Sequence, residues 1–140
     1  CGTVLGAKRG ALAVLLFIAL TALGLPLLSG GRGGLGIFAS PSVGFIVGFP
    51  LAAYVAGLIT TKLKMVKIFY SSLLGAIIGG IFVLYIPGII GMSIILGKSI
   101  SEATVIALIY LPGDLIKAFL CATLTQTLFK LRPADVLSRS

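Results

Sequence analysis

The sequence predicts an all-α protein, a polytopic transmembrane helix bundle, and three observations support this fold class. Of the 140 residues, 59% are hydrophobic and only 10% are charged, whereas a soluble domain has roughly a quarter of its residues charged. The mean hydropathy is +1.23. The charged residues leave three long uncharged intervals, each sufficient for the roughly 20 helical residues that cross a bilayer. We therefore expect a single transmembrane domain over residues 1–140.

Three spans are predicted from the uncharged intervals, at residues 10–28, 41–61 and 68–90. Pro41 is expected in the first turn of the second span, where its missing N–H removes no helical hydrogen bond. Pro87 is expected near the far end of the third span. Each interval leaves residues for a connecting loop.

A fourth span is predicted at residues 111–131, the last apolar run, although it carries an acid and a lysine near its start. Before it, Ser101 and Glu102 are suited to begin a short helix at residues 103–110. This helix is too short to cross a bilayer and is expected at the outer surface. Residues 1–7 have the character of the tail of an earlier helix. The chain should therefore contain four full spans.

The distribution of Lys and Arg predicts the orientation of these spans, because short cytoplasmic loops are enriched in both. One side of the predicted bundle has only Arg32 and Lys98. The other side has Lys8, Arg9, Lys62, Lys64, Lys67, Lys130, Arg132 and Arg139. We therefore expect a multi-pass protein of the cytoplasmic membrane, with a cytoplasmic C-terminus and with residues 29–40 and 91–110 facing outward.

Small residues on two spans predict close helix packing. The second span has a small residue at every fourth position, which forms a smooth ridge, and the third span has a smaller patch of the same kind. The ridge consists of Gly44, Gly48, Ala52 and Ala56, and the patch of Gly75 and Gly79. We expect these residues to let neighbouring helices approach closely. The pattern of small residues indicates helix packing only and gives no evidence of a chemical role.

The composition argues against an enzyme and against a nucleic-acid-binding protein. The chain has no His and three acidic residues, which is little material for a metal site or a proton relay, so no cofactor is expected. The net charge of +8 is not arranged in a long basic stretch with interleaved aromatic residues. Cys1 and Cys121 are far apart in sequence, which gives no support for a disulfide framework.

The predicted outer loop, SGGRGGLGIFASPS, is rich in glycine and contains Arg32. A phosphate-binding loop would need a parent strand, which a loop between two membrane helices lacks. One interpretation is that glycine lets the backbone bend back toward the bundle and brings Arg32 to an opening between helices. The other is a flexible exterior loop with a solvated arginine. The spacing alone does not favour either.

The segment LPGDLIK is the most informative part of the sequence. Pro112 suits the first helical turn, so Asp114 lies in that turn and Lys117, three residues later, lies on the same face. Asp114 is alternatively only a residue favoured by the helix dipole, and Lys117 a lysine that snorkels to the surface. Ionisable residues within a span usually face a cavity, however, because exposing them to lipid costs roughly 2.5 to 3.5 kcal/mol.

A cavity with one carboxylate and one ammonium group suits a solute that has both N–H donors and an anionic group. Phe38, Phe45 and Tyr110 are predicted at the same outer level as this pair. They could form apolar walls, although aromatic residues at that depth are often interface anchors.

Three segments resemble the BioY-type substrate-binding (S) components of energy-coupling factor (ECF) transporters, which capture biotin. They are GALAVLLFIALTALGLPLLSGGRGGLG, SPSVGFIVGFPLAAYVAGL and YLPGDLIKAFLCATL. The resemblance extends over almost the whole chain. Its most specific parts are the glycine-rich loop, the Pro-Ser-x-Gly-Phe start of the second span and the Leu-Pro-Gly-Asp-x-x-Lys start of the last.

This resemblance implies a six-helix bundle with both ends cytoplasmic, of which the chain would contain helices three to six and the end of helix two. It places Asp114 and Lys117 in a biotin pocket, with residues 30–36 and 41–45 as its lid and rim. The ureido N–H groups of biotin would donate to Asp114, and Lys117 or Arg32 would neutralise its carboxylate. The predicted substrate-binding residues are Asp114, Lys117, Arg32, Gly34, Ser42, Gly44, Phe45 and Tyr110.

The resemblance also implies a transmembrane coupling subunit and a pair of cytoplasmic ATPases as partners, with no nucleotide site in this chain. Two alternatives remain open. The chain could be an S component for another vitamin, or a structural membrane subunit in which Asp114 and Lys117 form only an intrahelical pair. The last alternative predicts a dry interface around Lys117 with no adjoining cavity.

Overall fold

The computed structural model describes residues 1–28 and 30–139, and it confirms the all-α fold class. Over these residues the regular structure is helical, apart from one isolated β-bridge between Leu28 and Arg32. The 3₁₀-helices are η1 and η3, and η2 is a π-helix. In chain order the elements are α1 (Gly2–Leu5), α2 (Ala7–Ala22), η1 (Leu35–Ala39), α3 (Val43–Lys62), α4 (Ile68–Ile77), η2 (Ile78–Val83), α5 (Leu84–Leu96), α6 (Ile100–Leu108), α7 (Leu111–Leu131) and η3 (Pro133–Asp135).

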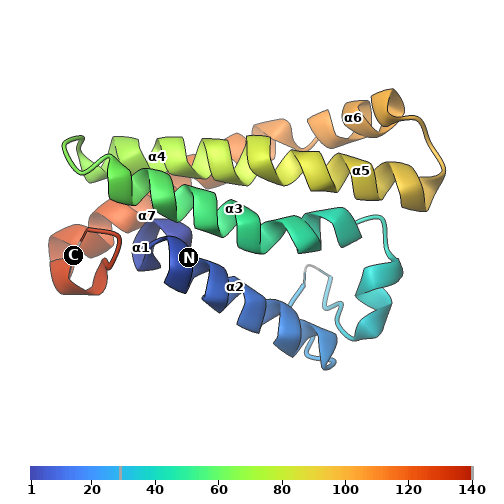
Figure 1. Cartoon of the computed structure of the whole chain (residues 1–140), viewed down its shortest axis with the longest axis horizontal. Helices are drawn as coiled ribbons and strands as arrows, with labels where there is room; N and C mark the ends of the chain where they lie inside the picture. Colours follow the sequence, from blue (N-terminus) through green and yellow to red (C-terminus); the bar gives the residue numbers. More distant parts are fainter. Residues whose placement is uncertain (29, 140) are drawn as a thin grey trace.

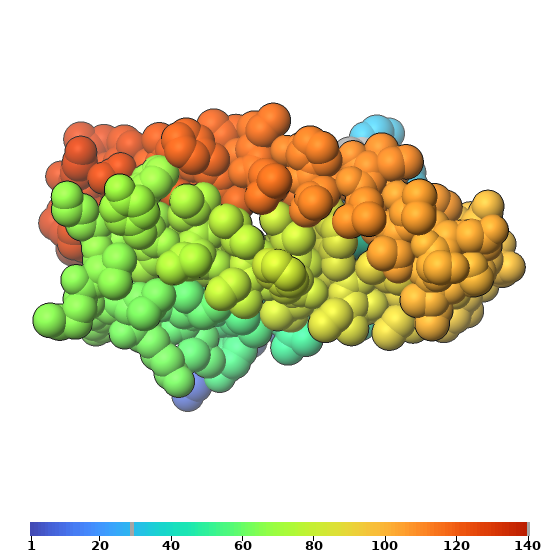
Figure 2. Space-filling model, turned by 90° about the horizontal axis from the view of Figure 1, so that it is seen from above, coloured from blue at the N-terminus to red at the C-terminus, as the bar shows by residue number. Residues whose placement is uncertain are grey.

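Helix α3 lies at the centre of the bundle (Figure 1) and packs against α1, α2 and the long helix formed by α4, η2 and α5. Helix α7 packs along α4, and α6 packs against α5. Figure 2 shows α6 and α7 running beside the α4–η2–α5 helix along the length of the molecule. This arrangement encloses space between α2, α3 and α7.

Two described helices are long and apolar enough to cross a bilayer, α3 and the continuous helix Ile68–Leu96. Helices α6 and α7 pass the same test as a pair bent by 53°. Helix α7 occupies the predicted residues 111–131. The short helix before it, α6 (Ile100–Leu108), meets α7 at this bend, and its place at the outer surface stays a prediction.

The helix predicted over residues 10–28 ends earlier, at Ala22. Its 16 residues span only about 24 Å at 1.5 Å per residue. Gly24 then adopts φ 112°, a conformation that ends a helix, and the backbone N–H of Gly34 donates to the carbonyl of Thr21 at 2.7 Å. The prediction that residues 23–28 are helical is wrong, because the chain turns here to return to the bundle.

The third predicted helix continues past residue 90 to Leu96, so Pro87 lies inside it and not near its end. The π-helical turn η2 ends at Val83, four residues before Pro87. A proline cannot donate to the carbonyl four residues earlier, and its ring crowds that carbonyl. The wider π turn relieves this crowding while the helix continues.

Two helix starts also differ from the prediction. Helix α3 begins at Val43, so Pro41 precedes it in a turn and does not lie in its first helical turn. Helix α6 begins at Ile100 with Ser99 as its N-cap. The Ser99 hydroxyl accepts from the Glu102 backbone N–H at 3.3 Å, and the Glu102 carboxylate accepts from the Ser99 N–H at 3.1 Å. This capping box, and not Ser101, starts the helix.

The ridge of small residues on α3 packs against the α4–η2–α5 helix, which confirms its predicted role. A Cβ atom on Gly44 would collide with the carbonyl oxygen of Pro87. A Cβ atom on Gly79 would lie 2.5 Å from the carbonyl oxygen of Ala52. The ridge on α3 and the patch on α4 and η2 therefore fit against each other, with backbone atoms of the two helices in close contact.

The C-terminal tail is fixed to the end of the bundle where α3 connects to α4 (Figure 1). The Arg139 guanidinium donates to the carbonyl oxygens of Lys64 at 2.6 Å and Val66 at 2.9 Å. The Ser138 backbone N–H donates to the carbonyl of Val4 at 3.0 Å. The lysine-rich connection and the C-terminus, predicted on the same side of the membrane, thus lie together.

Candidate functional site

A cavity of about 660 Å³ lies among α2, α3, the α4–η2–α5 helix and α7. Its volume falls within the range of small-molecule sites, about 300 to 1,000 Å³. Most of its lining is apolar, for example Val14 of α2, Phe49 of α3 and Leu84 of α5. The few polar groups in the lining are therefore the groups that can orient a ligand.

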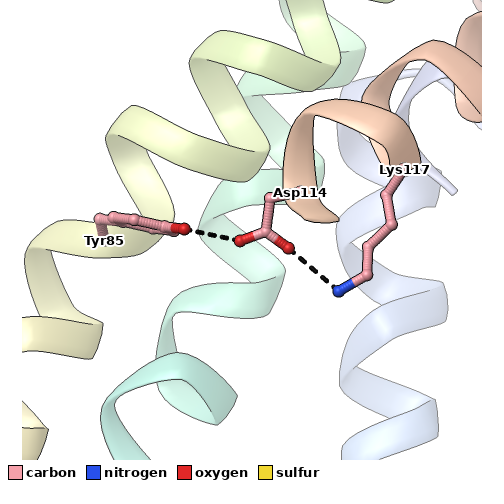
Figure 3. Close-up of polar contacts among 3 residues, drawn as sticks. All are labelled: Tyr85, Asp114 and Lys117. Carbon is pink, nitrogen blue, oxygen red and sulfur yellow. Dashed lines mark hydrogen bonds and ion pairs between the residues drawn. The ribbon is translucent and has the colours of Figure 1, made fainter. Parts of the chain in front are cut away.

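Asp114 and Lys117 line this cavity from the first turns of α7. The Lys117 Nζ lies 3.0 Å from the Asp114 Oδ1, and the side chains are 78% and 20% exposed, respectively. Figure 3 shows the lysine reaching back along its helix toward the carboxylate. The predicted pairing on one helix face is confirmed. The pair adjoins a cavity, so the dry interface expected for a purely structural pair is not found.

Tyr85 holds the other oxygen of the carboxylate. Its hydroxyl donates to the Asp114 Oδ2 at 2.7 Å (Figure 3). Tyr85 lies on α5 and is only 8% exposed, and it is not among the residues that line the cavity. The Tyr85 hydroxyl therefore contacts Asp114 from the packed interior of the bundle and not from the cavity.

Phe45 connects the cavity wall to this polar group. Its ring meets the ring of Tyr85 edge to face, with centroids 6.0 Å apart, a favourable aromatic geometry. Gly88 makes room for it, because a Cβ there would lie 2.5 Å from a ring carbon of Phe45. Phe45 also packs on the buried cluster that includes Ile81 and Tyr85. The same cluster therefore contacts the cavity wall at Phe45 and contains the hydrogen-bond partner of the Asp114 carboxylate.

Arg32 reaches the cavity because the glycine-rich loop turns back toward the bundle. The backbone N–H of Leu28 donates to the Arg32 carbonyl at 3.1 Å, and the Gly31 N–H donates to the Leu28 carbonyl at 3.0 Å. Gly30 and Gly31 adopt φ of 79° and 71°, which residues with a Cβ atom rarely adopt. Ser29, in the same predicted loop, lies outside the described residues.

The structure brings six of the eight predicted site residues to one cavity. They come from the loop, α3 and the start of α7, and are Arg32, Ser42, Phe45, Tyr110, Asp114 and Lys117. Gly34 and Gly44 do not line it. Gly34 is the N-cap of η1 with φ 82°, and Gly44 packs against α5. Phe38, considered as a wall, is also not part of the lining.

The sequence analysis missed two groups of residues at this site. Cys1, Gly2, Thr3 and Cys121 line one part of the cavity, and the Thr3 Oγ1 lies 3.4 Å from the Cys121 Sγ. Tyr85 was missed as the partner of Asp114. A phenol within an apolar helix needs a hydrogen-bond partner, and that requirement was the one signal in the sequence that could have identified it.

The arrangement suits binding and not catalysis. A carboxylate that accepts hydrogen bonds, an ammonium group that donates them and apolar walls are sufficient to hold a small solute. Among residues 1–28 and 30–139, no group of three or more His, Cys, Asp or Glu residues is placed to hold a metal ion.

The chain is similar to known biotin transporters over most of its length. The BioY family model matches residues 1–134. A biotin transporter BioY of Rhodobacter capsulatus is 43% identical over 99% of this chain and 77% of its own length. That of Rhizobium etli is 47% identical over 88% of this chain and 68% of its own length.

The fold has a solved counterpart in the S-component for biotin from an ECF-type ABC transporter. The two structures agree with a TM-score of 0.85 at 30% sequence identity, over 92% of this chain and 69% of that one. The sequence match extends over nearly the whole chain, and this structural agreement covers the same helices. The chain therefore belongs to the BioY family.

Proposed function

We propose that this chain binds biotin and takes part in its uptake across the cytoplasmic membrane, as the S component of an ECF-type transporter. Family membership supports the substrate, because relatives of this chain are biotin transporters by name. The observation that carries the proposal is the Asp114–Lys117 pair at a largely apolar cavity.

The chemistry of biotin matches the cavity group by group. Its ureido ring has two N–H donors, which a carboxylate such as Asp114 accepts, and its side chain ends in a carboxylate, which Lys117 or Arg32 can neutralise. Phe45 and the apolar residues around it would contact the fused rings. The pair of opposite charges in this protein thus complements a ligand with donors at one end and an anion at the other.

The proposal includes partners that supply the energy for transport. A transmembrane coupling subunit would contact the chain within the membrane, and a pair of cytoplasmic ATPases would drive release of the vitamin. Co-purification of the chain with both kinds of subunit, from cells that produce all of them, tests this part. Recovery of the chain without either subunit would contradict it.

The binding test uses the purified protein and radiolabelled biotin. Asp114→Asn and Lys117→Ala should each weaken binding by roughly 10- to 150-fold, because a hydrogen bond to a charged group contributes about 1.5 to 3 kcal/mol. Asp135→Asn and Lys130→Ala are matched controls, since both residues are exposed and outside the cavity. They should retain wild-type affinity.

Two outcomes would contradict the proposal. Wild-type affinity in both cavity variants would remove Asp114 and Lys117 from the site. Displacement of bound biotin by thiamine, riboflavin or folate at similar concentrations would point to a different vitamin.

A further inference from the structure

Both oxygens of the Asp114 carboxylate are engaged, and by very different partners. Oδ2 accepts from the hydroxyl of Tyr85 at 2.7 Å, and Oδ1 accepts from the Nζ of Lys117 at 3.0 Å. The Tyr85 partner is buried, whereas the Lys117 side chain is 78% exposed. Figure 3 shows the carboxylate between the two.

The two hydrogen bonds therefore differ in how easily they exchange. Lys117 is a long side chain with several rotatable bonds, and it lines the cavity, so its ammonium group can leave Oδ1 without moving the backbone. Tyr85 has two rotatable bonds, and its ring is fixed against Phe45 and Ile81. Its hydroxyl can leave Oδ2 only if the buried cluster repacks.

The π-helical turn in the α4–η2–α5 helix determines the direction from which Tyr85 meets Asp114. Tyr85 follows the π-helical turn η2, which ends at Val83. A π turn contains about one residue more than an α turn, and one residue corresponds to about 100° of rotation around the helix. The turn thus sets the face on which Tyr85 lies, and this face points toward α7 and not into the cavity.

We propose that Tyr85 is a positioning residue for ligand binding, which fixes the Asp114 carboxylate through Oδ2 and leaves Oδ1 as the oxygen that a ligand N–H takes over from Lys117. This inference rests on the proposed biotin-binding function. It assigns a role to a residue that does not contact the ligand. It also gives binding an order of partners at Oδ1: Lys117 leaves, the ligand N–H arrives, and the released ammonium group becomes available to the ligand's carboxylate.

The physical advantage lies in preorganisation. Rotation of a carboxylate about its last torsion is soft, so an Asp114 without Tyr85 would offer its oxygens in many directions. A ligand N–H would then have to order the carboxylate on binding, and the free energy needed for this ordering would lower the affinity. With Oδ2 held, the direction of Oδ1 is set before the ligand arrives.

Tyr85→Phe tests this role, because it removes the hydroxyl and keeps the ring that contacts Phe45. The dissociation constant of biotin should rise roughly 2- to 13-fold, because the ligand would then have to order the Asp114 side chain itself, at a cost of about 0.5 to 1.5 kcal/mol. Tyr54→Phe is the matched control, since Tyr54 lies on α3 outside the cavity lining and is 37% exposed. It should bind biotin as the wild type does.

A second ligand distinguishes positioning from general support of the fold. A biotin analogue with methyl groups on the ureido nitrogens has no N–H to donate to Oδ1. Tyr85→Phe should leave its dissociation constant, measured by competition, unchanged, so the selectivity for biotin over this analogue should fall roughly 2- to 13-fold. Incomplete folding raises the apparent dissociation constants of both ligands by the same factor, so their ratio still gives an answer for a poorly folding variant.

Three results would decide against the inference or its basis. Unchanged biotin affinity in Tyr85→Phe would overturn the positioning role and leave the proposed function intact. Equal losses for biotin and the methylated analogue would show that the hydroxyl only supports the fold. Absence of biotin binding by the wild-type protein would instead overturn the proposed function itself.

Discussion

Several buried hydroxyl groups in this bundle form hydrogen bonds with one another or with the backbone, whereas the buried Ser72 hydroxyl has no hydrogen-bond partner among the described residues. The hydroxyls of Thr3 and Thr125 lie 2.9 Å apart, the Thr60 hydroxyl donates to the Ala56 carbonyl at 2.9 Å and the Ser71 hydroxyl donates to the Ile68 carbonyl at 3.1 Å. A bilayer core offers no water to such groups, so an unpaired hydroxyl costs free energy. The Thr3–Thr125 contact therefore contributes to holding α1 against α7.

Thr125→Val should lower the free energy of unfolding by about 1 kcal/mol, since it removes a buried hydrogen bond at nearly constant side-chain volume. Thr123→Val on the same helix is the matched control, because the Thr123 hydroxyl is exposed and donates only to the Phe119 carbonyl within α7. Unfolding in detergent, followed by circular dichroism, measures both. Equal losses in the two variants would contradict a role for the Thr3–Thr125 contact.

At the scale of helices, the bundle depends on close contacts of backbone with backbone. Gly44 lies against the carbonyl of Pro87, and Gly91 lies so close to Gly44 that a Cβ there would be 2.6 Å from its Cα. Dispersion contacts of this kind are a main source of helix association in lipid, where apolar side chains gain little from leaving the solvent. The proline and the π turn in the partner helix belong to the same interface.

Gly44→Ala should destabilise the protein by roughly 1 to 3 kcal/mol, because the new methyl group meets a backbone carbonyl that cannot move without the helix. Gly113→Ala is the matched control. Gly113 is also helical, but nothing lies within 4 Å of a Cβ placed there, so stability should be unchanged or slightly higher. Thermal unfolding in detergent compares the two. A harmless Gly44→Ala would show that α3 and α5 can separate at little cost.

For the whole molecule, packing brings two basic segments together at one end of the bundle. The connection between α3 and α4 carries several lysines and is bound by Arg139 of the C-terminal tail. Burial lowers the pKa of Arg139 below its usual value, but an arginine remains charged at neutral pH. The positive-inside rule therefore predicts that this end of the bundle is cytoplasmic.

A reporter at each end tests this orientation. Green fluorescent protein fused after the C-terminus should fluoresce, and alkaline phosphatase at the same position should be inactive, because the predicted side is the cytoplasm. Alkaline phosphatase inserted at Gly97, between α5 and α6, should be active. The reverse pattern at both positions would show that the bundle is inverted.

The fold class, the helix at residues 111–131 and the presence of Asp114 and Lys117 on one of its faces could be predicted from the amino-acid sequence. These features depend on local composition and on helical periodicity, which act within one or two turns. The packing ridge on α3 could be predicted for the same reason. The predicted helix ends were less accurate. The end of α2, for example, depends on a hydrogen bond from Gly34 in the loop that returns to the bundle.

The full set of residues that meet at the cavity depends on how the helices pack and could not be predicted from the sequence. Tyr85 and Asp114 are 29 positions apart, and their contact depends on a π turn and on the packing of α7 against the neighbouring helix. Arg32 reaches the same space through a glycine turn. Such contacts between distant segments result from how whole helices fit together, and no periodicity within one segment specifies them.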